Sequence, residues 1–179
     1  MRNLFFTFSK IVCFVMVIAM LGACQHAVQP SIVPAIEVKK QTTHSLGTIG
    51  EVEPIYVLPM KSPFSSRVDT GAKISSLDAK NVKMFERDGE KWVSFTMKNR
   101  ETGESHRFEK EIVRDVYIKR PKKDERRYIV RMNVKIGPEV LIEEFTLADR
   151  EKFEYQVLIG RNILTGRAVV DTSLSNTLY

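Results

Sequence analysis

The sequence has few of the residues that build disulfide frameworks or zinc sites. Its 179 residues include 2 cysteines and 3 histidines. Two cysteines are too few for a disulfide framework or a Cys-rich zinc site. The histidines are His26, His44 and His106, and none belongs to a His-Glu-x-x-His motif, so a catalytic zinc site lacks ligands. The sequence therefore predicts a protein with no metal and no other cofactor.

Strong charge of one sign is also absent. The chain has 28 Lys and Arg against 22 Asp and Glu, and a net charge of +6 is too mild to indicate a nucleic-acid partner without a concentrated patch. Apolar residues make up 43% and charged residues 28%, which excludes a polytopic membrane protein and a wholly disordered chain. The length suits one globular domain with an appendage.

The N-terminus carries an apolar run that is too short to span a membrane. It extends from Ile11 to Leu21 between the basic residue Lys10 and the segment Leu21 to Cys24. A transmembrane helix needs about 20 residues, so the pattern predicts a secretory signal peptide. An ordinary signal cut after Ala23 is one interpretation.

The ending Leu-Gly-Ala-Cys also resembles the bacterial lipobox, in which the signal is cut before a cysteine that becomes acylated. This resemblance implies a signal peptide at residues 1–23 and lipidation of Cys24. Gln25 then implies an anchor in the outer membrane of a Gram-negative cell, with the protein facing the periplasm.

The remaining chain is predicted to be a flexible tether at residues 24–46 and a folded domain at 47–179. Pro30 and Pro34 interrupt the tether, which shows no sustained periodicity. In the domain, short apolar runs and alternations broken by Gly, Pro, Asn and Asp predict an all-β barrel or sandwich. An Asp-Gly turn at Asp88 favours a hairpin, and Gly166 ends a short helix near 161–165. The expected strands are 53–58, 65–68, 74–79, 82–87, 92–98, 107–113, 115–119, 128–136 and 140–147.

Two short motifs point to chemistry. Asp69-Thr70-Gly71 follows an apolar strand, and alone it is an ordinary turn sequence. About 90 residues later, the apolar run 157–159 leads into Gly160, Arg161 and Asn162. Together the two motifs resemble the retropepsins, and the segment 69–79 resembles a bacterial retropepsin-like family often labelled "ATP-dependent zinc protease". The scarcity of zinc ligands and the lack of a phosphate loop reject both halves of that label.

The resemblance implies a closed β-barrel with one short C-terminal helix, and it assigns roles to the motif residues. Asp69 would be the catalytic carboxylate of an aspartic endopeptidase. Thr70, Gly71 and Ala72 would support it. Leu158, Ile159 and Gly160 would flank a peptide substrate, and Arg161 would have a structural role.

The aspartic mechanism needs two carboxylates that share one proton around a water molecule. The chain has one Asp-Thr-Gly, so the resemblance implies a homodimer in which each subunit gives Asp69. Asp171, after the apolar run 168–170, is an alternative partner within the chain. We expect instead that it ends a strand and pairs with an arginine.

Two departures from the retropepsin pattern keep a second function open. Lys73 stands where retropepsins usually have an acid, so Arg161 needs another acidic partner, with Asp78 or Asp149 as candidates. The region expected to close over substrate is poor in glycine and contains the basic segment 119–127, which is either a solvated hairpin tip or a contact for an anionic surface. A retropepsin-shaped binding or scaffolding lipoprotein without efficient hydrolysis is therefore the alternative to the endopeptidase.

Overall fold

The computed structural model describes residues 43–119 and 125–179. The predicted signal peptide, Cys24 and the predicted tether up to residue 42 lie outside the described residues, as does the middle of the basic segment. Within the described ranges, no helix has the length and apolar character needed to cross a membrane.

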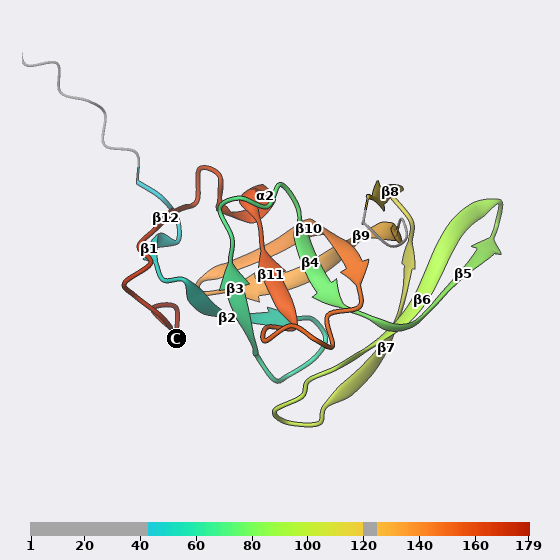
Figure 1. Ribbon diagram of the computed structural model, residues 1–179, viewed down its shortest axis with the longest axis horizontal. Coiled ribbons are helices and arrows are strands. Elements are labelled where there is room, and N and C mark those ends of the chain that lie inside the picture. Colours follow the sequence, from blue (N-terminus) through green and yellow to red (C-terminus); the bar gives the residue numbers. More distant parts are fainter. Residues whose placement is uncertain (1–42, 120–124) are drawn as a thin grey trace, which may run out of the picture. The chain divides into compact units, whose positions relative to one another are not determined.

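Six strands close into a barrel (Figure 1). Their order around the ring is β10-β4-β11-β3-β2-β9, and the ring closes because β9 also pairs with β10. An additional strand, β8 (Arg114–Ile118), extends the sheet beyond β9. The barrel strands are β2 (Val52–Val57), β3 (Phe64–Val68), β4 (Ser75–Asp78), β9 (Glu125–Ile136), β10 (Glu139–Ala148) and β11 (Val157–Ile159).

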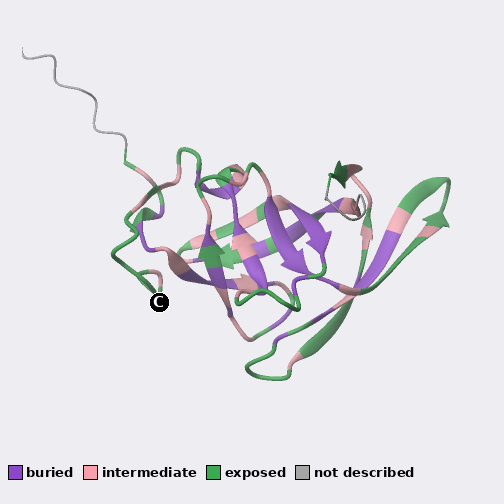
Figure 2. Cartoon of the chain, viewed as in Figure 1, coloured by how far each residue is buried: buried purple, intermediate pink, exposed green. Residues whose placement is uncertain are grey.

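The barrel strands carry many of the buried residues (Figure 2). In β9, Val130, Met132 and Val134 are fully buried, and the residues between them face outward. This period of two places one apolar face toward the interior and one polar face toward solvent. Ile55 and Ile159 contribute to the same core from β2 and β11.

A three-stranded antiparallel sheet extends from the barrel (Figure 1). It consists of β5 (Lys80–Arg87), β6 (Glu90–Lys98) and β7 (Ser105–Glu111). The predicted Asp-Gly turn joins β5 to β6, and Asp88 and Gly89 both have positive φ, as a tight hairpin turn requires. Phe95 of β6 belongs to the same buried cluster as the barrel core, so the sheet is packed onto the barrel.

The ends of the domain meet at a small parallel sheet. β1 (Gly47–Ile49) pairs with β12 (Ala168–Val170), which follows the helix α2 (Arg161–Leu164). Beyond β12 the chain runs back along β2, where Asn176 donates a backbone hydrogen bond to Val52.

The predicted fold class is confirmed: the protein is almost entirely β, with a closed barrel and one short helix. The nine expected strands correspond to β2–β10, with ends that differ by at most a few residues. The sequence did not predict β1. This strand has three residues, two of them exposed, which is too short for an apolar alternation to be recognised.

Candidate functional site

Asp69 lies at the end of β3, where the barrel opens to solvent. Its backbone N–H donates to the carbonyl of Ile159 at 2.9 Å. This contact follows from the parallel pairing of β3 with β11, which sets Val68 beside Ile159. The structure thus brings the two predicted motifs together, with buried Ile159 and Gly160 and half-buried Leu158 next to Asp69.

The Asp69 side chain is held by its own turn. Its Oδ1 accepts hydrogen bonds from the backbone N–H groups of Gly71 at 2.8 Å and Ala72 at 3.1 Å. Among the described residues, no group donates a hydrogen bond to Oδ2. Asp69 is half-buried, whereas Thr70 and Gly71 are exposed. The turn therefore fixes one carboxylate oxygen and leaves the other for a ligand.

The helix α2 begins directly against this turn. The first N–H groups of a helix have no partner inside the helix. Here those of Arg161 and Asn162 donate to the carbonyls of Ala72 at 2.9 Å and Lys73 at 3.3 Å. The loop after Asp69 thereby supplies the hydrogen bonds that the helix start needs, and the two segments set each other's position.

The expected acidic partner of Arg161 is not found, and that prediction is wrong. Its Nη1 donates instead to the backbone carbonyls of Thr70 at 3.1 Å and Gly71 at 3.3 Å. Asp78 is bound by Arg100 at 2.8 Å, and Asp149 by Lys80 at 2.6 Å. The carbonyl oxygens of the turn accept hydrogen bonds from the Arg161 guanidinium group. These bonds hold the loop, so it does not need an acidic residue at position 73.

Ser75 and Asn162 are positioning residues that the sequence analysis did not single out. Asn162 Oδ1 accepts from both the backbone N–H and the hydroxyl of Ser75, and Ser75 Oγ accepts from the backbone N–H of Gly160 at 2.9 Å. The available signal was the pair Ser75 and Ser76 in the strand after the Asp69 turn, because a buried hydroxyl needs a partner.

Gly160 is required because the backbone of the Asp69 loop passes close to it. A Cβ at this position would lie 2.9 Å from the Ile74 carbonyl carbon and 3.0 Å from the Ala72 carbonyl oxygen. Both are backbone atoms that cannot rotate away. The glycine therefore allows the β11–α2 junction to lie against the loop.

Asp171 does not pair with an arginine, so this expectation is also wrong. It follows β12, as expected, but its Oδ1 accepts hydrogen bonds from the backbone N–H of Ser173 at 2.9 Å and from its hydroxyl at 2.7 Å. These bonds lower the pKa of the Asp171 carboxyl. The carboxylate closes a local turn.

Two basic residues, Arg67 and Lys73, flank the Asp69 turn in the sequence. Arg67 is paired with Glu51 at 3.0 Å. Lys73 is exposed and has no ion-pair partner among the described residues. Over residues 43–119 and 125–179, no group of three or more His, Cys, Asp and Glu side chains is arranged to hold a metal ion. The loop thus carries a half-buried carboxylate with one oxygen bound by its own turn, and an exposed lysine four positions later.

Several curated proteins are similar to this chain. A probable alpha-L-glutamate ligase from Desulfotalea psychrophila is 34% identical over 118 residues, which cover 63% of this chain and 25% of the relative. Proteins of the same name from Shewanella pealeana and Parasynechococcus marenigrum are each 34% identical, over 62% and 63% of this chain and 25% of their own length. The chain therefore spans about a quarter of the length of these relatives.

These names correct the predicted enzyme class. The sequence analysis predicted an aspartic endopeptidase, whereas the curated relatives are named as ligases, so that prediction is contradicted. The two motifs on which that prediction rested, the Asp69 turn and the start of the helix at Arg161, determine a loop geometry and a fold. Proteins of one fold can have different activities, so these motifs do not determine the enzyme class.

A solved structure and a family model agree on the fold. The crystal structure of Lpg0085, a protein of unknown function from Legionella pneumophila, is 33% identical and matches with a TM-score of 0.65, covering 74% of this chain and 98% of that one. The family model described as "Retropepsin-like aspartic endopeptidase RimB" matches residues 48–178, nearly the whole described domain. The chain belongs to this RimB-like family of retropepsin-like proteins.

Proposed function

We propose that this domain binds a glutamate-containing peptide chain at the Asp69 loop and serves α-L-glutamate ligation as an accessory. The name of the curated relatives supports glutamate as the residue recognised. The match to about a quarter of their length supports an accessory domain rather than the ligase itself. The retropepsin-like fold supports an extended polypeptide as the form of the ligand.

The observation that carries the proposal is the state of the Asp69 carboxylate. The backbone N–H groups of Gly71 and Ala72 hold Oδ1 by hydrogen bonds, so the Asp69 side chain already has a fixed orientation. Binding of a ligand therefore costs little side-chain entropy at Asp69. Oδ2, without a donor in the described part of the chain, is placed to accept a backbone N–H of the peptide. A charge-assisted hydrogen bond of this kind is about twice as strong as a neutral one.

The charge near the loop favours an acidic ligand. Lys73 is exposed and has no ion-pair partner within residues 43–119 and 125–179. It is four positions after Asp69, on the loop whose carbonyls bind the start of α2. Its ammonium group would pair with a glutamate side chain of the peptide while Asp69 accepts the backbone N–H.

The binding unit in this proposal is a homodimer that brings two Asp69 loops together across a two-fold axis. Thr70 is exposed, and its hydroxyl makes no hydrogen bond to any described residue, which supports a contact from loop to loop. We further propose that a lipid on Cys24 anchors the protein to the outer membrane of a bacterial cell, facing the periplasm. Labelling of cells with palmitate tests this anchor, and the label should be lost in Cys24→Ser. A label that persists in Cys24→Ser would show that Cys24 does not carry the lipid.

Calorimetric titration of the full chain with α-linked tri-L-glutamate, and with tri-L-glutamine for comparison, tests the binding function. In Asp69→Asn an amide N–H₂ replaces Oδ2 and meets the peptide N–H donor. Two N–H donors that face each other weaken binding by about 1–3 kcal/mol. The substitution also removes the repulsion between the Asp69 carboxylate and the acidic peptide, but between exposed charges this is worth at most ~1 kcal/mol. We expect triglutamate to bind Asp69→Asn about tenfold more weakly than the wild type.

Asp88→Asn is the matched control, because Asp88 is exposed at the β5–β6 turn and asparagine tolerates its positive φ. Its affinity should equal that of the wild type. Equal affinity of Asp69→Asn and wild type for triglutamate would overturn the proposal. So would cleavage of triglutamate by the wild type that Asp69→Asn abolishes, because the site would then be hydrolytic.

A further inference from the structure

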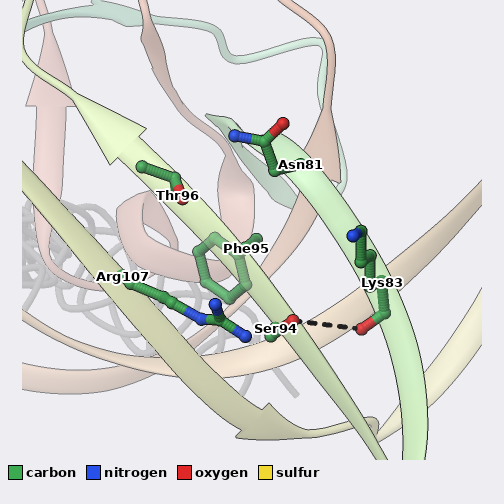
Figure 3. A pocket seen from close by; sticks show the side chains of 6 residues that line it. All are labelled: Asn81, Lys83, Ser94, Phe95, Thr96 and Arg107. Atoms are coloured by element: carbon green, nitrogen blue, oxygen red, sulfur yellow. Dashed lines mark hydrogen bonds between the residues drawn. The ribbon is translucent and has the colours of Figure 1, made fainter.

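The three-stranded sheet carries a polar hollow, separate from the Asp69 loop, to which no role has been assigned. Figure 3 shows the side chains that surround it, which come from all three strands. Its volume is about 240 Å³. The lining residues are Asn81 and Lys83 of β5, Ser94, Phe95 and Thr96 of β6, and Arg107 of β7. We call this feature the bulge hollow.

Strand register explains why these side chains gather. Lys83 pairs with Ser94, and Thr96 pairs with Arg107, so the polar members lie on one face of the sheet. Between Lys80 and Lys83 the register of β5 shifts, and Asn81 has a φ of 54°. A β-bulge leaves a residue unpaired and bends its strand, which redirects nearby side chains. Here the bulge lies at the edge of the hollow.

The hollow is rich in hydrogen-bond donors, and none of its lining residues is acidic. Lys83 has an ammonium group with no ion-pair partner among the described residues. The acid recorded near Arg107 is Glu109, at 3.9 Å, which is beyond hydrogen-bonding distance. Glu109 is already bound by Arg87 at 2.6 Å. Glu109, the cross-strand neighbour of Ser94, therefore compensates Arg107 in part, whereas Lys83 has no acidic partner in the described part of the chain.

The remaining polar lining groups suit a carboxylate. The Asn81 amide and the Thr96 hydroxyl add neutral donors to the two charged ones, whereas the Ser94 hydroxyl already donates to the Lys83 carbonyl (Figure 3). Ser94 is buried at 4% exposure, so part of the hollow is shielded from water, where a charge-assisted bond is stronger. The Phe95 ring is fully buried, stacked on Phe108 on the other face of the sheet, and supports the hollow from the core.

We infer that the bulge hollow is a carboxylate-binding subsite that takes a glutamate side chain of the acidic peptide, with Lys83 and Arg107 as the charged donors. The inference rests on the proposed function, since it assigns a second contact to the same ligand. When one peptide spans both contacts, the second forms at a high effective concentration, which raises affinity and selects acidic over neutral peptides.

Amide chemical shifts of the full chain, recorded during titration with tri-L-glutamate, test the subsite independently of the Asp69 loop. We expect saturable shifts at the backbone amides of Ser94 and Thr96, in addition to those of Gly71 and Ala72. Shifts at Gly71 and Ala72 alone would overturn the subsite and leave the proposed function standing. Shifts at Ser94 and Thr96 alone would support the subsite and count against the proposed function.

A charge-matched pair of variants completes the test. The double variant Lys83→Gln/Arg107→Gln should bind triglutamate about tenfold more weakly than the wild type. The control Lys91→Gln/Lys98→Gln removes two exposed cations of the same sheet that lie outside the hollow. Its affinity should stay within about twofold of the wild type. Equal weakening in both double variants would show a general charge effect and overturn the inference. Inorganic phosphate that displaces triglutamate from Ser94 and Thr96 at equal concentration would overturn the assignment to a carboxylate.

Discussion

Asn162 holds Ser75 through a single oxygen atom: its Oδ1 accepts hydrogen bonds from the backbone N–H and from the hydroxyl of Ser75, each at 2.9 Å. The other end of the same amide donates to the Glu144 carbonyl at 3.0 Å. One side chain therefore connects α2 to β4 and β10. Because Ser75 Oγ also accepts from Gly160, this connection fixes the β11–α2 junction beside Asp69.

We expect Asn162→Ala to lower the free energy of unfolding by about 2–3 kcal/mol. The variant leaves the Ser75 N–H and the Glu144 carbonyl without partners, and an unsatisfied buried group costs about 1–3 kcal/mol. Urea denaturation measures the change. The control is Thr172→Ala, at an exposed residue after β12, which should change stability by less than about 0.5 kcal/mol. Equal stability of the two variants would show that the amide does not support the site.

The sequence predicted the strands because apolar residues recur at a period of two, as in β9, or in short runs that turn residues interrupt. The β5–β6 hairpin is the clearest case, since Asp88 and Gly89 adopt the positive φ that the Asp-Gly pair indicates. The juxtaposition of residues 69–72 with 158–161 came from resemblance to a family. No local pattern shows that β3 pairs in parallel with β11, about 90 residues later.

The sequence did not predict the partners of charged side chains. Arg161 and Asp171 were each expected to pair with an opposite charge, and both bind neutral groups of nearby loops instead. Backbone carbonyls and N–H groups are present at every residue, so composition alone does not tell which of them will be close enough. The bulge hollow was missed for a similar reason, because the register shift after Lys80 is a property of strand pairing.

Glu53 anchors the C-terminal segment, and replacing its carboxyl group by an amide should release that segment. The side chain is fully buried. Its Oε1 accepts from the N–H of Gly50 at 2.6 Å and from the N–H and hydroxyl of Thr177 at 3.1 and 2.7 Å, and its Oε2 accepts from the N–H of Leu178 at 3.0 Å. In Glu53→Gln an amide N–H₂ must face at least one of these donors.

We expect Glu53→Gln to lose about 1–3 kcal/mol of unfolding free energy and to speed amide hydrogen exchange at residues 176–178. Glu51→Gln is the matched control two residues away. Its carboxylate pairs with Arg67 at the surface, with 34% of the side chain exposed, and such pairs contribute at most about 1 kcal/mol. Slow exchange at 176–178 in Glu53→Gln would mean that the tail is held by other contacts.

The pair between Arg114 and Glu144 should make stability depend on pH. Arg114 of β8 donates from Nη1 to Glu144 Oε1 at 2.9 Å across the sheet. The hydrogen bonds from the guanidinium lower the pKa of the Glu144 carboxyl below its ordinary value. The pKa is therefore lower in the folded than in the unfolded chain, where it is about 4.3. The stabilisation is complete above the unfolded value and disappears as the pH falls through the folded value.

Urea denaturation of wild type and Glu144→Gln between pH 7 and pH 3 measures this contribution. At pH 7 the wild type should be the more stable, by at most about 1 kcal/mol because the pair lies near the surface. The difference should shrink below about pH 4, where the wild-type carboxyl also becomes neutral. Glu139→Gln, on the same strand and without an ion pair among the described residues, should differ from wild type by a nearly constant amount. A difference between Glu144→Gln and wild type that stays constant down to pH 3 would mean that the ionisation of Glu144 is not linked to folding, and that its pair with Arg114 does not make stability depend on pH.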